Sequence, residues 1–217
     1  MRFRRPSQWW LLYCLLVPAT PFLYAQDSNA AGPTAGGLAQ PSLAEKWNVF
    51  GSETMSPMTL VTAVPQAIAS QLTGYAPMYG KYFRAEPFAE RFAATVGDGV
   101  SRNFFADFAL ASALHEDTRY VREGPGHGVW HRIGYAISRA VITRTDSGAS
   151  TFNWANVAGS AMSAGLSNAY YPPTSRTAGV AAVSWGTDIG GAGLTNLAPE
   201  FGSDIGRWLR RHLPFHH

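Results

Sequence analysis

The chain has 217 residues, of which 46% are hydrophobic and 14% charged, and it contains a single cysteine. This length supports one domain with a substantial core, and the composition excludes a collagen-like chain, a disulfide scaffold and a highly charged disordered protein. The net charge of +3 does not indicate nucleic-acid binding, because Arg2, Arg4 and Arg5 account for it and the other basic and acidic residues balance.

The first 25 residues have the pattern of a cleaved secretory signal peptide. A positively charged start is followed by an apolar stretch over residues 9–24, which two prolines interrupt. This stretch is shorter than the roughly 20 apolar residues of a membrane-spanning helix. We predict cleavage after Ala25 and export to the periplasm or the outer membrane. Cys14 is then lost, and the mature chain has no thiol for catalysis.

Residues 26–42 are rich in Ala, Gly, Pro, Ser and Gln, a composition typical of a flexible tether. From residue 43 to residue 217 the apolar residues follow a mostly helical periodicity, which predicts one helical domain. A helix is expected to begin at Ser56-Pro57, because Ser is a good N-cap and Pro is favoured at the first helical position. The clearest helix begins at Pro87, with an apolar residue at every fourth position as far as Phe108.

The C-terminal part predicts a helical hairpin that is rich in small residues. Between residues 147 and 199 the only charged residues are Arg176 and Asp188. Two helix-length segments, 152–170 and 177–197, flank Pro172-Pro173, and Pro199 begins an amphipathic helix. We therefore predict an all-α helical bundle with this hairpin either in the membrane or in the protein core.

Small residues at every fourth position let two helix backbones approach closely. Ala155 and Gly159 have this spacing in the first helix of the hairpin, and Gly186 and Gly190 have it in the second. We therefore expect these four residues to line a close contact between helices.

A polar cluster is predicted at one end of the bundle. The segment 115–122 is dense in acids and arginines, and the phenols and cation of the segment 170–176 are two helix connections further along the chain. In an up-and-down bundle successive connections alternate between the two ends. Segments two connections apart therefore lie at the same end, and the Asp146 turn between them lies at the other. Such a cluster would suit either a polar ligand or a clamp between helices. Its expected members are Glu116, Asp117, Arg119, Tyr120, Arg122, Tyr170, Tyr171 and Arg176.

Within the Pro87 helix, Asp98 and Arg102 have the spacing of an ion pair. Asp188 lies in an apolar, glycine-rich segment, where a carboxylate is costly unless it is paired. Its expected partners are Arg139, Arg144 or Arg176, and a buried structural pair is favoured over a functional acid.

No motif of metal binding, cofactor binding or catalysis stands out. His127 and His131 are four residues apart, but His127 lies in a glycine-rich turn and no third ligand has metalloprotease spacing. We therefore predict no metal site, no cofactor and no catalytic residue.

Several short elements resemble a group of uncharacterised exported bacterial proteins. The resemblance implies export and a shared helical fold but no activity, and Thr118 stands where that group has a proline. The elements are Y-G-K-x-F at 79–83, L-H-E-D-x-R-Y at 114–120, T-R-T-D-S-G at 143–148, N-x-Y-Y-P at 168–172 and E-F at 200–201.

The sequence favours an exported, membrane-associated or structural protein of the cell envelope without catalytic activity. Its expected partner is the membrane or another envelope protein, not a nucleic acid. The alternative is an envelope hydrolase or an anion-binding module that uses the 115–122 loop.

Overall fold

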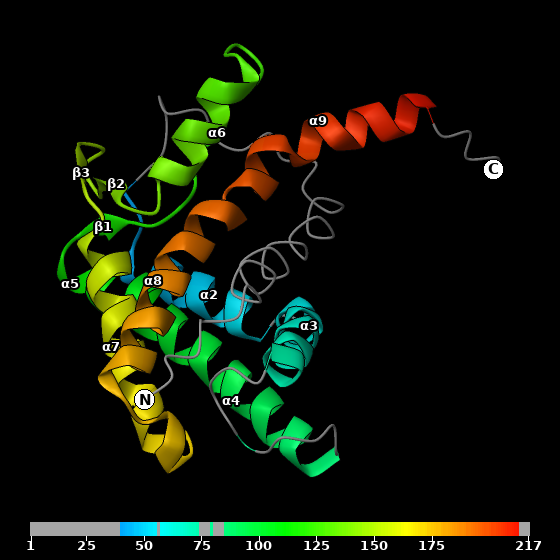
Figure 1. Cartoon of the computed structure of the whole chain (residues 1–217). Helices are drawn as coiled ribbons and strands as arrows, with labels where there is room; N and C mark the ends of the chain where they lie inside the picture. The colour runs from blue at the N-terminus through cyan, green and yellow to red at the C-terminus, as the bar shows by residue number, and fades with distance from the viewer. Residues whose placement is uncertain (1–39, 56, 74–78, 80–84, 213–217) are drawn as a thin grey trace, which may run out of the picture.

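The computed structural model describes residues 40–55, 57–73, 79 and 85–212 (Figure 1). The signal peptide, most of the tether and the helix cap at Ser56 are predicted for residues outside these ranges. The described part is predominantly helical, which confirms the all-α prediction, and it also contains a small three-stranded sheet.

The first two described helices pack beside a long central one. Helix α2 (Leu43–Thr54) begins with a reciprocal cap, in which the Ser42 hydroxyl accepts from the Glu45 backbone and the Glu45 carboxylate accepts from the Ser42 backbone. Helix α3 (Pro57–Thr73) lies along α4 (Ala85–Asn103). Arg91 of α4, fully buried, donates to the Ser70 hydroxyl of α3 at 2.8 Å.

The long helix predicted from Pro87 continues from α4 through a π-helical segment, η3 (Phe104–Leu110), into the short α5 (Ala111–Ala113). The wider turn of η3 places Phe104 and Phe108 against α2. There the rings of Trp47 and Phe108 are 4.8 Å apart, edge to face.

The small antiparallel sheet follows the long helix. Strands β1 (Glu116–Asp117), β2 (Ile142–Thr145) and β3 (Ser150–Phe152) lie in the order β1-β2-β3. Helix α6 (Val129–Ser138) separates β1 from β2 in the chain. The predicted turn at Asp146-Ser147-Gly148 connects β2 to β3, and Gly148 adopts a left-handed φ of 91°. This sheet was not predicted, because strands of two to four residues are too short to show alternation in the sequence.

The C-terminal half is built on α7 (Trp154–Tyr170), which packs against α4, η3 and α8 (Ala178–Thr195). A short 3-10 turn, η4 (Pro173–Ser175), connects α7 to α8 and confirms the hairpin predicted around Pro172-Pro173. Helix α9 (Leu197–His212) follows α8 after one residue and extends away from the body of the molecule (Figure 1). No helix among the described residues is long and apolar enough to cross a membrane.

One of the four small residues makes a close contact, but its partner is not the other helix of the hairpin. A Cβ on Gly159 would lie 2.6 Å from the backbone of Ala106, so α7 touches η3 there rather than α8. Ala155 is fully buried. A Cβ on Gly186 or Gly190 of α8 would meet no atom within 4 Å. The prediction for these two glycines is wrong, because they lie on a side of α8 that no other described element covers.

Candidate functional site: a polar cavity between the helices

A partly open cavity of about 410 Å³ lies between the helices. Its volume is in the range of sites for small molecules. The walls come from α2, the junction of α4 and η3, the loop after β1, the end of α6, the first turn of α7 and the junction of α8 and α9. Its polar lining residues are Glu53, Arg102, Asp107, Thr118, Arg119, Tyr120, Arg139, Asn153, Asn156, Thr195 and Asn196.

Two asparagines at the start of α7 hold one wall of the cavity in place. The Asn153 side chain caps α7 by accepting from the backbone of Asn156 at 2.9 Å. Asn156 donates to the Ala140 carbonyl and accepts from Arg102 Nη2, both at 2.9 Å. The amide of Asn156 therefore fixes Arg102 at the cavity wall without cancelling its positive charge. The helix spacing had predicted an ion pair between Arg102 and Asp98. That ion pair does not form.

Arg139, at the end of α6, has a side chain with no polar partner among the described residues. Its guanidinium lies over the ring of Tyr135, with the central carbon 4.8 Å from the ring centroid. Its Nε is buried, and the guanidinium makes no hydrogen bond or ion pair with any residue in the described part of the chain. A buried donor without an acceptor is costly. Because Arg139 also lines the cavity, an acceptor bound there could pair with its guanidinium.

Two carboxyl groups face the arginines. The Asp107 carboxyl lies 3.8 Å from Arg102 Nη1, and desolvation raises its pKa while Arg102 acts in the opposite direction. The pKa of Glu53 is raised by desolvation and then by the Asp107 carboxylate, while Arg102 lowers it, although Glu53 is one of the exposed residues of α2. Both shifts favour the neutral acids, which reduces the negative charge that opposes the arginines.

The first part of the predicted cluster, Glu116 to Arg119, is locked into structural contacts. The buried Glu116 carboxylate accepts from the backbone of Trp154 and Ala155, at 3.3 and 2.9 Å, and so caps the N-terminus of α7. Asp117 binds Arg119 through two parallel hydrogen bonds of 2.8 Å. Arg119 reaches the cavity wall as half of this ion pair.

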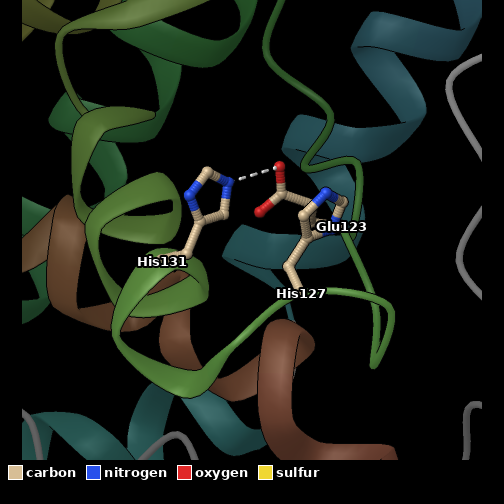
Figure 2. Close-up of side chains that lie close together, drawn as sticks. All are labelled: Glu123, His127 and His131. Atoms are coloured by element: carbon tan, nitrogen blue, oxygen red, sulfur yellow. Dashed lines mark hydrogen bonds and ion pairs between the residues drawn. The ribbon is translucent and has the colours of Figure 1, made fainter.

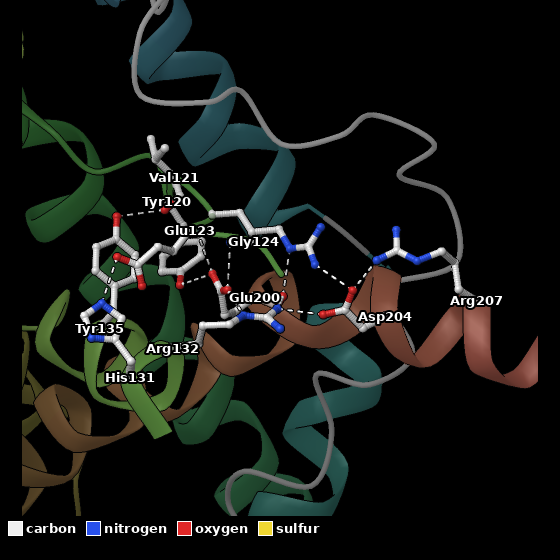
Figure 3. Close-up of polar contacts among 11 residues, drawn as sticks. Tyr120, Val121, Glu123, Gly124, His131, Arg132, Tyr135, Glu200, Asp204 and Arg207 are labelled. Carbon is white, nitrogen blue, oxygen red and sulfur yellow. Dashed lines mark hydrogen bonds and ion pairs between the residues drawn. The ribbon is translucent and has the colours of Figure 1, made fainter. Parts of the chain in front are cut away.

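Tyr120 and Arg122 belong to a second network, which attaches α9 to the loop and to α6 (Figure 3). Its centre is Glu200, whose carboxylate accepts from Arg132 at 2.6 Å and from the Tyr120 hydroxyl at 2.8 Å. Arg122 and Arg132 also both pair with Asp204. Desolvation acts to raise the pKa of Glu200, but the hydrogen bonds from Arg132 and the loop lower it below the ordinary value.

Three members of this network were not predicted from the sequence: Arg132, Glu200 and Asp204. The available signal was Glu200 in the E-F element, which carried part of the family resemblance.

Tyr170 and Tyr171 lie at the other end of α7. Their hydroxyls donate to the two oxygens of Asp98, at 2.5 and 2.6 Å. Arg176 donates to the Tyr171 carbonyl at 2.6 Å. Burial raises the pKa of Asp98 to about 6, and the two tyrosines oppose this shift.

The prediction of one polar cluster is therefore wrong. Glu116 caps the first turn of α7 and Tyr170 is its last residue, so about 25 Å of helix separates them. The connections do not alternate between the two ends, because β1 follows the long helix and α6 is short, so the chain turns back at the same end. The Asp146 backbone donates to the His115 carbonyl at 2.7 Å, which places this turn beside the 115–122 loop rather than opposite it.

Asp188 does not form the expected ion pair. Among the described residues it makes no hydrogen bond or salt bridge with Arg139, Arg144 or Arg176. Burial raises its pKa to about 7, while Arg102 lowers it and Asp98 raises it. Asp188 therefore makes no ion pair or hydrogen bond with the residues that the structure describes, and its raised pKa favours the neutral acid.

Comparison with protein-family models, with curated proteins and with solved structures found no match. The resemblance to exported bacterial proteins stays a prediction, and the interpretation of the cavity depends on its own chemistry.

Proposed function

We propose that this protein is an exported binding protein for a small anion, which it holds in the cavity through Arg139 and Arg102. The observation that carries this proposal is the Arg139 guanidinium at the cavity wall, for which the described part of the chain provides no hydrogen-bond acceptor. A carboxylate or a phosphate matches the planar fork of an arginine side chain better than other common ligand groups do.

The surrounding side chains support an anion that also makes neutral hydrogen bonds. Asn153 and Asn156 line the cavity, and each amide nitrogen carries a second N–H besides the one that it donates to the Arg139 or Ala140 carbonyl. Asp107 and Glu53, when protonated, can donate to a ligand oxygen instead of repelling it. Export is part of the proposal because of the basic and apolar pattern of residues 1–25.

Hydrolysis is a second candidate function. It is favoured by the two carboxyl groups with raised pKa that face arginines across the same cavity, because such groups are typical of acid–base catalysis. A structural role in the envelope, with a membrane or protein partner, is the remaining proposal and needs no ligand in the cavity.

The test is a calorimetric titration of the purified chain with inorganic phosphate and with citrate. Arg139→Ala is expected to weaken binding by about tenfold to a hundredfold, because a charge-assisted hydrogen bond contributes about 1.5–3 kcal/mol. Arg211→Ala removes the same charge from an exposed position on α9 and serves as the matched control.

Equal affinities of the Arg139 and Arg211 variants would contradict the proposed site. If neither anion binds the unaltered chain, the structural role becomes the better proposal. Binding that survives in Asp107→Asn, together with loss of any turnover of a phosphate ester, would favour hydrolysis.

A further inference from the structure

Three potential metal ligands meet where the loop after β1 enters α6. Glu123, His127 and His131 each offer one ligand atom, and these atoms lie within 4.8 Å of one another (Figure 2). Nε2 of His131 is 3.1 Å from Oε1 of Glu123. The two imidazole rings are stacked, with centroids 5.0 Å apart. We infer that these residues form a binding site for a divalent transition-metal ion such as Zn²⁺, which goes beyond the proposed anion binding.

The ligand types and their separations suit such an ion. Zn²⁺ binds imidazole nitrogen and carboxylate oxygen at about 2.0–2.2 Å, so two ligands of a tetrahedral site are about 3.3 Å apart. The His131–Glu123 separation of 3.1 Å is already close to this value. Two histidines and one carboxylate leave a fourth position open for water or another ligand. Ca²⁺ and Mg²⁺ fit less well, because they prefer a shell of oxygen atoms.

Two of the three ligands are held in place by contacts of their own backbone or of a neighbouring residue with the buried Glu200 carboxylate. The Glu123 backbone donates to the buried Glu200 carboxylate at 3.0 Å, and Arg132, next to His131, pairs with the same carboxylate. The metal site thus lies directly beside the network that attaches α9 to the loop and to α6 (Figure 3). Such outer contacts orient metal ligands and reduce the entropy that binding must overcome.

The carboxylate of Glu123 still has an unused oxygen. Its Oε2 is buried and has no hydrogen-bond partner among the residues that the structure describes. His127, the third ligand, lies between Gly126 and Gly128, and a Cβ on either glycine would meet no atom within 4 Å. As far as the described residues show, the loop therefore has room to move His127 the short distance that closes the site.

The experiment is a calorimetric titration with ZnCl₂ in which His216 and His217 are replaced by alanine, so that terminal histidines do not contribute. One Zn²⁺ is expected per chain. His127→Ala, His131→Ala and Glu123→Gln are each expected to weaken binding by at least about tenfold, since even outer-shell changes cost that much in metal sites. His115→Asn is the control: His115 is exposed, lies outside the cluster and has a left-handed φ of 54°, which asparagine tolerates.

Two further measurements make the result decisive. Co²⁺ in place of Zn²⁺ is expected to give the visible absorption of a tetrahedral site, which His131→Ala abolishes. The circular dichroism of each variant without metal should match that of the parent chain, because both histidines are exposed. The inference is overturned if Zn²⁺ does not bind saturably, or if the His127 and His131 variants bind it as tightly as the His115 control.

Discussion

The contact between α7 and η3 at Gly159 can be tested with a single methyl group. An alanine at this position would place its Cβ 2.6 Å from the backbone N and Cα of Ala106 and 2.9 Å from its Cβ. Carbon atoms normally approach to about 3.5–4.0 Å, so the two helices must separate locally by roughly 1 Å. Overpacking of this kind costs about 1–3 kcal/mol. The higher helix propensity of alanine offsets about 1 kcal/mol of that cost.

Gly165 provides a matched control in the same helix. A Cβ at this position meets no atom of the described residues within 4 Å, so Gly165→Ala gains the helix propensity, about 1 kcal/mol, without a packing cost. The difference between the two variants isolates the packing cost, about 1–3 kcal/mol. In a chain of this size it corresponds to a melting temperature roughly 2–12 °C lower for Gly159→Ala than for Gly165→Ala. Thermal unfolding followed by circular dichroism measures this difference. Equal melting temperatures would refute the close contact.

Three other predictions concern the buried network, the pH dependence and the N-terminus. Arg132→Met is expected to lower the free energy of unfolding by about 3–5 kcal/mol in urea titrations, because Glu200 is fully buried and loses its cation. An exposed ion pair would lose less than about 1 kcal/mol, and a loss that small would contradict the prediction. Burial raises the pKa of Asp188 from 3.8 to about 7. Between about pH 4 and pH 7 the folded state therefore holds a proton that the unfolded state has released. The free energy of unfolding consequently falls as the pH rises through this range. Asp188→Asn should therefore stabilise the protein at pH 8, by no more than about 4 kcal/mol, and hardly at pH 4; an equal effect at both pH values would show that the acid is not desolvated. The exported protein should begin after Ala25 by intact mass, and an envelope form that retains residues 1–25 would exclude cleavage.

The helices of this fold were predictable because their signals are local. Apolar residues at every fourth position and the breakers Pro57 and Pro172 located α3, α7 and α8 to within a few residues. The π-helical segment η3 was not predictable in this way, because its apolar spacing is also compatible with an ordinary α-helix.

The partners of the polar residues were not predictable from spacing. Asp98 and Arg102 are four residues apart on one helix, yet Asp98 binds the two tyrosines at the end of α7 and Arg102 binds Asn156 at its start. Each of these partners is more than 50 residues away in the chain, so the tertiary arrangement of α7 decides the pairing. For the same reason Gly159 was correctly expected to make a close contact, but its partner, Ala106, could not be identified.

The attraction of the cavity for an anion depends on arginine side chains rather than on a helix terminus. The first turn of α7 lines the cavity, and a free helix N-terminus would offer backbone N–H groups and a positive partial charge. Glu116 already accepts from two of these N–H groups and places a buried negative charge beside them. The helix terminus is therefore neutralised by the protein itself. Arg119 is similarly neutralised by Asp117. Of the arginines that line the cavity in the described part of the chain, Arg139 and Arg102 remain, and the carboxyl beside Arg102, that of Asp107, has its pKa raised by desolvation.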